Sequence, residues 1–299
     1  MTAHRTTLVA ATAMTTLLIM LGGVVCVTES ARGCPDWPRC YGQLVPPMRI
    51  DAIIEYAHRL VAALTTPFII AAAIMGARRA RAPWWSRRPP IIAIPLLVAV
   101  VTFGAFAVLR GLPTWAAVLD VGSALLVLAL IVTASVATSR SAHPDFADRW
   151  SLESRLARWS AVSAAGLFAV LVSGVVVAAP GSTVRCLGCL VPSTEPDAAG
   201  LRGAIQIARL MFAGLLGAAI AAVVTRVLNA ERDAALRRAA TVAGALLVGL
   251  VLISVAVALR GSTTALRVAA VVTVVSLWVS VVALAALSAL RRTSGGRSA

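Results

Sequence analysis

The sequence predicts an all-α integral membrane protein with eight transmembrane helices, arranged as two tandem four-helix bundles. Three observations lead to this fold class: the composition, eight long apolar segments and an internal repeat. Hydrophobic residues make up 60% of the 299 residues, charged residues only 13%, and the mean hydropathy is +0.90. A soluble domain carries far more charge than this, so the chain belongs in lipid.

Each of the eight apolar segments is long enough for a helix to cross the roughly 30 Å hydrocarbon core of a bilayer. They lie near residues 8–28, 52–76, 91–109, 115–138, 159–178, 203–225, 239–259 and 264–290. The apolar runs are continuous and do not alternate, which favours helices over barrel strands. The first segment could alternatively be a cleaved signal peptide over 8–25, but it is long for one and no small-x-small site follows it.

The two halves of the chain repeat with an offset of 150 residues, which separates His58 from Ala208 and Arg110 from Arg260. Each half then holds four helices, and because four is an even number both halves enter the membrane in the same direction. We expect an N-terminal half over 1–138, a polar cytoplasmic linker over 139–158 and a C-terminal half over 159–299. The result is a parallel internal repeat.

Arginine supplies all 27 basic residues, and 17 of them fall in the pieces that lie on one side of this topology. The positive-inside rule places that side in the cytoplasm, together with both termini. The net charge of +15 could indicate nucleic-acid binding. Because the arginines gather at helix ends and follow topology, we expect membrane lipids as partners and no nucleic acid.

The stretch GCPDWPRCYGQLVPP, residues 33–47, forms the first loop on the predicted outer face, where the environment is oxidising. Two prolines between Cys34 and Cys40 restrict the backbone, so a disulfide between these cysteines is plausible. The matching loop of the second half holds Cys186 and Cys189, with the spacing of redox pairs and zinc knuckles. Two loop-stiffening disulfides and exchange with a thiol partner both stay open, and zinc is the weaker interpretation.

Cys26 differs from these four cysteines because it lies at the end of the first apolar segment. We interpret it as a buried apolar residue.

Three ionisable residues lie at the start of the second apolar segment. An ionisable side chain in the membrane costs free energy, so each of them indicates a structural or functional role. Glu55 and His58 are three residues apart, so they share one face of a helix, and Arg59 follows directly. A carboxylate and an imidazole so placed could bind a metal-centred cofactor and move protons beside it. The alternative is a Glu–Arg–His cluster that only anchors the helix end.

Asp120 lies near the outer end of the fourth segment between apolar neighbours, so it needs a polar partner. Arg59, Arg110 and His58 are the candidates, because helices two and four of a bundle can face each other across a central site. In the second half the positions that match His58 and Asp120 are Ala208 and Ala270. That half has lost the equivalent polar pair, although Arg209 remains.

The motif GCPDWPRCYGQLVPP followed by EYAHRLVAAL resembles the first outer loop and second helix of the heme A synthase (CtaA-type) family. Members of that family oxidise the C8 methyl group of heme O to the formyl group of heme A, which terminal oxidases use. The resemblance implies that Glu55 is the catalytic carboxylate, that His58 is the axial ligand of the heme iron, and that Cys34 and Cys40 are the loop pair. It also implies heme O as substrate and a heme b cofactor in the second half.

The resemblance is incomplete at the other ligand positions, where the family has three further histidines. Asp120 occupies the second position, Ala208 the third, and Ala270 or a neighbour within Val268–Val271 the fourth. The remaining histidines, His4 and His143, lie in polar inner segments. Alanine has no donor atom and carboxylate is a poorer axial ligand than imidazole, so the sequence argues against heme b in the second half.

Three functions follow from these patterns. The first is a heme A synthase-like oxidoreductase of the plasma membrane, with heme O on His58 and with Arg59 or Arg110 pairing with propionates. The second is a non-catalytic heme-binding or oxidase-assembly paralogue. The third is a scaffold without heme. A heme O-producing enzyme and a thiol-disulfide protein are the partners that the resemblance implies.

Overall fold

The computed structural model describes residues 2–111, 113–177 and 201–292, and within them the chain forms eight α-helices and one short 3₁₀ turn. The helices are α1 Thr2–Val27, α2 Ile50–Ala77, α3 Trp84–Arg110, α4 Thr114–Arg140, α5 Arg155–Val177, α6 Leu201–Ala230, α7 Ala234–Arg260 and α8 Thr264–Ala289. All eight are long and apolar enough to cross a membrane. The predicted all-α membrane fold is confirmed.

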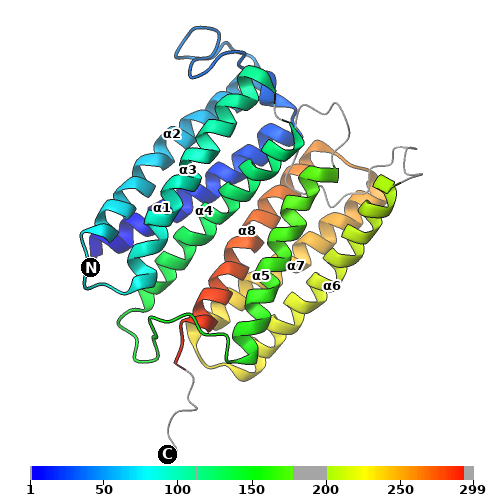
Figure 1. Ribbon diagram of the computed structural model, residues 1–299. Helices are drawn as coiled ribbons and strands as arrows, with labels where there is room; N and C mark the ends of the chain where they lie inside the picture. The colour runs from blue at the N-terminus through cyan, green and yellow to red at the C-terminus, as the bar shows by residue number, and fades with distance from the viewer. Residues whose placement is uncertain (1, 112, 178–200, 293–299) are drawn as a thin grey trace, which may run out of the picture.

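The helices pack as two rings of four, as Figure 1 shows. In the first ring α1 packs on α2, α2 on α3, α3 on α4, and α4 returns to α1. The second ring repeats this order with α5 to α8. The arrangement places α2 and α4 at opposite corners of the first bundle, and α6 and α8 at opposite corners of the second.

The main hydrophobic core fills the second bundle and continues into its contact with α1 and α4 of the first. Helix α8 packs against α1 and α4, and α4 also packs against α5. Half or more of the central residues of α4 and α8 are buried within the protein (50% and 56%), against 11% for α3 and for α7. The corresponding helices of the two halves thus have the same environment: α4 and α8 are central, while α3 and α7 present most of their surface to the lipid.

The connection between α4 and α5 is hydrogen-bonded to both halves. The backbone N–H of Ala147 donates to the carbonyl of Leu290 at the end of α8, at 2.9 Å. The carboxylate of Asp148 accepts hydrogen bonds from the first amides of α3, those of Trp84 and Trp85, at 2.5 and 3.1 Å. Because the first amides of a helix have no partner within it, Asp148 acts as a cap for α3 from far along the chain.

The helix ends define two ends of the molecule. The terminal end holds the start of α1 and the end of α8, and the loop end holds the segment between α1 and α2 (Figure 1). The start of α1 and the end of α8 therefore lie at the same end, as an even number of crossing helices requires.

The close contact of α1 with α8 at Gly23 leads to a first prediction. A Cβ atom at Gly23 would overlap the side chain of Val271 on α8, whereas a Cβ at Gly104 on α3 would meet nothing within 4 Å. Gly23→Ala should therefore lower the thermal unfolding midpoint in detergent, by the equivalent of about 1–3 kcal/mol. The matched substitution Gly104→Ala should be neutral or slightly stabilising. Equal effects of the two substitutions would contradict the packing of the two halves through α1 and α8.

Candidate functional site

A disulfide closes the loop at the loop end of the first bundle. Cys34 and Cys40 are bonded to each other, with their Cα atoms 4.7 Å apart, which confirms the predicted bridge. Both cysteines are fully buried. Their sulfurs are therefore shielded from an external thiol in this conformation, and the geometry favours the loop-stiffening role over exchange with a partner.

Asp36 organises the turn inside this disulfide ring. Its carboxylate accepts hydrogen bonds from the amides of Gly42 (2.7 Å) and Tyr41 (2.5 Å), and both of these residues have positive φ angles of 70° and 55°. The Gly42 amide, with the Tyr41 amide and the charge of Arg59, lowers the pKa of Asp36. The loop is thus held by an ionised carboxylate, and protonation would loosen it only at a pH below the usual range for aspartate.

Glu55 and Arg59 of α2 fasten the loop to the bundle. Glu55 is buried, and its Oε2 accepts a hydrogen bond from the backbone N–H of Cys34 at 2.8 Å. Its Oε1 forms an ion pair with Arg59. The guanidinium of Arg59 also donates to three loop carbonyls, those of Asp36 (2.6 Å), Arg39 (2.7 Å) and Cys34 (3.1 Å). Glu55 and Arg59 thus form an anchoring cluster, which differs from the Glu–Arg–His alternative of the sequence because His58 takes no part and because it holds the loop; its contacts engage both carboxylate oxygens.

His58 faces α1 and does not join this cluster. Its ring lies against Gly22, where a Cβ atom would come within 3.2 Å of the imidazole Cε1, and beside the backbone of Leu18. The absence of a side chain at Gly22 makes room for the ring. The Nδ1 atom is buried and has no hydrogen-bond partner among the described residues. A buried polar atom without a partner is costly, which makes His58 Nδ1 a candidate ligand atom, while the same imidazole is held by a hydrogen bond to the backbone of Leu18.

Asp120 of α4 is the second unsatisfied polar side chain of the first bundle. Its Oδ1 is buried without a hydrogen-bond partner in the part of the chain that the structure describes. Of the partners considered from the sequence, Arg59 is engaged by Glu55 and the loop, and Arg110 is exposed at the end of α3. Asp120 and His58 belong to helices at opposite corners of the same bundle.

The second bundle presents a different set of side chains. Ala208 is exposed on α6 and Ala270 is half-buried on α8, and neither has a donor atom. Arg209 is buried and turns toward α5, where its guanidinium donates to the carbonyl of Val170 (3.1 Å) and to the hydroxyl of Ser173 (3.1 Å). Of the roles considered for Arg209, the helix interface is the one that these contacts support.

Two expectations from the sequence need correction. His4 does not lie in a polar inner segment: it belongs to α1, is buried, and its Nε2 contacts the carbonyl of Ser86 at 3.3 Å. Cys26 is buried as expected, but it is also disulfide-bonded, so its role is not only apolar packing. His143 does lie in a polar segment, the one between α4 and α5. Cys186 and Cys189 lie outside the described residues.

The side chains of the first bundle fit a heme chemically, and those of the second do not. The first bundle offers one imidazole nitrogen and one carboxylate oxygen, both buried and unsatisfied, on helices that face each other. Imidazole is the common axial ligand of heme iron. At the matching positions of the second bundle alanine offers nothing to a metal.

These observations define the class of protein: a helical membrane protein of two four-helix halves, with a disulfide-closed loop over one half and an unsatisfied imidazole beneath it. The comparisons with known proteins agree with this class. Residues 5–288 match the COX15-CtaA family, described as cytochrome oxidase assembly protein. The chain belongs to this family.

Several relatives carry the name heme A synthase. The protein from Symbiobacterium thermophilum is 31% identical over 232 residues, which cover 75% of this chain and 73% of that protein. The protein from Halalkalibacterium halodurans is 30% identical over 131 residues, so the match spans only 44% of its length. A protoheme IX farnesyltransferase from Halobacterium salinarum is 33% identical over 89 residues, 30% of this chain and 20% of that protein.

The anchoring cluster predicts how the disulfide responds to reductant. Without reductant, Cys34 and Cys40 of the native protein should not react with a maleimide, because they are bonded and buried. Arg59→Gln removes the bonds to three loop carbonyls, so it should speed reduction and labelling by about tenfold or more. The measurement is the rate of maleimide labelling at a fixed reductant concentration.

Arg49→Gln is the matched control, since Arg49 forms an exposed ion pair with Asp51 at 2.7 Å and contributes little. If the Cys34–Cys40 disulfide is reduced at the same rate in the wild type and in Arg59→Gln, the cluster does not protect it from reductant.

Proposed function

We propose that this protein is a heme A synthase-like membrane oxidoreductase that acts on heme O in its first bundle. The observation that carries the proposal is the buried, unsatisfied Nδ1 of His58 in a protein whose family and named relatives act on heme. In this proposal His58 is the axial ligand of the iron. The substrate heme would supply the redox chemistry, and the protein would supply binding and orientation.

The side chains around His58 have distinct roles in this proposal. Asp120, on the helix at the opposite corner of the bundle, would hold or transfer a proton beside a bound heme. Arg110, exposed at the loop end of α3, pairs with a propionate. Arg59 is engaged with Glu55 and the loop, so it supports the site by holding the loop over it.

Glu55 has two possible contributions, because the carboxylate that anchors the loop is also the one that the family resemblance makes catalytic. As a catalytic group it would accept or return a proton at the reacting methyl group. As an anchor it would act only by keeping the disulfide loop in place. The two contributions are separable by experiment, because Arg59 shares the anchor but has no carboxylate.

Oxidation of a methyl group to a formyl group takes its oxygen atom from water and releases four protons and four electrons, so an electron acceptor outside this chain is required. The second bundle does not offer ligands for a heme that would carry these electrons, since Ala208 and Ala270 stand at the matching positions. We propose that a separate redox partner takes them. A heme O-producing enzyme would supply the substrate.

The same alanines, together with the engagement of Glu55 by Arg59, favour a second candidate: a heme-binding or oxidase-assembly paralogue without catalysis. In this alternative the first bundle binds heme through His58 but does not oxidise it. For either function we propose that the terminal end faces the cytoplasm and the disulfide loop the outside, since most arginines gather at the terminal end.

Expression in a host that accumulates heme O tests the catalytic function. The extracted heme should contain the formyl product, identified by its mass and by the red-shifted absorption of its pyridine complex. Extraction of heme O alone would contradict catalysis and leave the binding function.

Two variants then separate the contributions of Glu55. Glu55→Gln should lower product formation by about 10²-fold or more if the carboxylate transfers a proton. Arg59→Gln breaks the same anchor but keeps the carboxylate, so it should have a smaller effect. Equal losses in the two variants would assign Glu55 to the anchor alone.

Heme binding itself is tested with protein purified in detergent from heme-replete cells. The wild type should show a Soret band, and His58→Ala should lose it or shift it because the axial imidazole is removed. His143→Ala is the matched control, since His143 lies at the terminal end, and it should bind heme like the wild type. Wild-type protein that folds but contains no heme would exclude both heme functions and leave the scaffold interpretation.

A further inference from the structure

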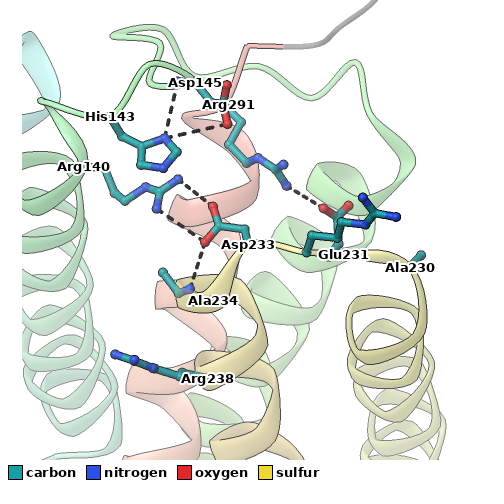
Figure 2. A pocket seen from close by; sticks show the side chains of 11 residues that line it. Arg140, His143, Asp145, Ala230, Glu231, Asp233, Ala234, Arg238 and Arg291 are labelled. Carbon is teal, nitrogen blue, oxygen red and sulfur yellow. Dashed lines mark hydrogen bonds and ion pairs between the residues drawn. The ribbon is translucent and has the colours of Figure 1, made fainter.

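A polar pocket of about 680 Å³ opens at the terminal end, away from the candidate heme site. Its walls come from the end of α4 with the residues that follow, the turn between α6 and α7, and the end of α8 (Figure 2). Arginines supply most of its charged groups. The pocket thus joins the first bundle to the second at the side where the arginines of the sequence are concentrated.

Two of these arginines are neutralised by carboxylates. Arg140 of α4 donates to both oxygens of Asp233, at 2.6 and 3.4 Å, and Arg291 donates to Glu231 at 2.9 Å, as the dashed lines in Figure 2 show. Asp233 also caps α7 by accepting from the amide of Ala235 at 2.8 Å. Burial opposes ionisation of Asp233, but the Ala235 amide and the charge of Arg140 together lower its pKa. Asp233 is therefore ionised, and both carboxylates are committed to their partners.

The other two arginines, Arg232 and Arg238, have no carboxylate partner among the described residues. Both line the same pocket and both are exposed. Figure 2 shows Arg238 extending from α7 toward α4, below the pair formed by Arg140 and Asp233. The third acid of the pocket, Asp145, lies 3.7 Å from the Nδ1 of His143 and forms no ion pair with either arginine, so the lining holds four arginines against three carboxylates.

The depth of the pocket matches the headgroup layer of a bilayer. Helix α7 begins at Ala234 and is apolar enough to cross the membrane from there to Arg260. Arg238 is four residues along, about 6 Å below the start of the helix at 1.5 Å per residue. Basic pockets between transmembrane helices at this depth are suited to anionic headgroups.

We propose that this pocket binds a phosphate group through Arg232 and Arg238, supplied by an anionic phospholipid or by a soluble phosphate ester. The pairs of Arg140 with Asp233 and of Arg291 with Glu231 hold the walls in place. They leave only the two unpaired guanidinium groups to meet the anion, and guanidinium groups suit phosphate oxygens. This site does not depend on the proposed heme chemistry.

Native mass spectrometry of the delipidated full chain in detergent tests the site. The probes are phosphatidylglycerol, phosphatidylcholine as the zwitterionic lipid, and glycerol 3-phosphate as the soluble ester. The variant Arg232→Gln/Arg238→Gln should weaken binding of the anionic probe roughly 30-fold, for two basic contacts. The matched control is Arg78→Gln/Arg226→Gln, which removes two exposed arginines at the same end but outside the pocket.

The outcomes separate the sources of the phosphate. Binding of phosphatidylglycerol that depends on the two arginines and is not displaced by glycerol 3-phosphate supports a lipid site. Binding of glycerol 3-phosphate with the same dependence supports a soluble ester. Equal losses in the pocket variant and the control, equal binding of phosphatidylcholine, or no binding of either anion would overturn the proposal. Thermal unfolding without ligand checks that each variant is folded, and Arg238→Gln alone serves if the double variant is not.

Discussion

The packing of α4 against α8 is the contact on which the rest of the architecture depends. In lipid, apolar side chains gain little by leaving the hydrocarbon, so helices associate through close packing and a few polar contacts. The indole Nε1 of Trp278 on α8 donates to the carbonyl of Leu125 on α4 at 3.2 Å, within the main core. With α4 and α8 central, α2 and α6 are left at the outer corners of their bundles, which sets where the functional side chains can lie.

Polar side chains inside the first bundle fall into two groups. Glu55 and Arg59 are fully engaged with each other and with the loop, and they convert a flexible segment into a fixed cover at one end of the bundle. Among the residues that the structure describes, His58 Nδ1 and Asp120 Oδ1 are buried without hydrogen-bond partners, as are His4 Nδ1 and Arg87 Nε nearer the terminal end. An unsatisfied polar group in lipid costs several kcal/mol. The contacts of Glu55 and Arg59 within the fold account for their burial, whereas the burial of His58 and Asp120 would be accounted for by a bound ligand.

The sequence was sufficient where local chemistry decides the structure. Hydropathy predicted all eight helices, and two cysteines separated by prolines predicted the bond between Cys34 and Cys40. It was insufficient where distant segments meet. Nothing near Asp148 indicates that it caps α3, 64 residues earlier, because that contact forms only once α3 and α4 are packed. The burial of His4 was missed because a polar N-terminal sequence does not show that α1 extends to Thr2.

For the candidate site, too, the sequence predicted the contacts within one helix but not those with distant segments. The i, i+3 and i, i+4 spacing of Glu55, His58 and Arg59 placed them together, but it did not decide between a catalytic group and an anchor. That choice depends on the loop, whose carbonyls meet Arg59 more than twenty residues before it in the chain. Likewise, the pair of Arg140 with Asp233 joins residues 93 positions apart and leaves no signal in either segment.

The repeat shows how one sequence position acquires two roles. Arg59 and Arg209 are equivalent, yet Arg59 turns to a carboxylate and a loop, whereas Arg209 turns to the backbone and hydroxyl of α5. The difference follows from the residue four positions earlier, Glu55 in the first half and Ile205 in the second. Without a carboxylate on its own helix, a buried guanidinium must find acceptors on a neighbour, and Ser173 with the Val170 carbonyl provides them. The arginine of the second half thereby becomes a link between α5 and α6, and with alanine at both ligand positions that bundle supports its partner through packing.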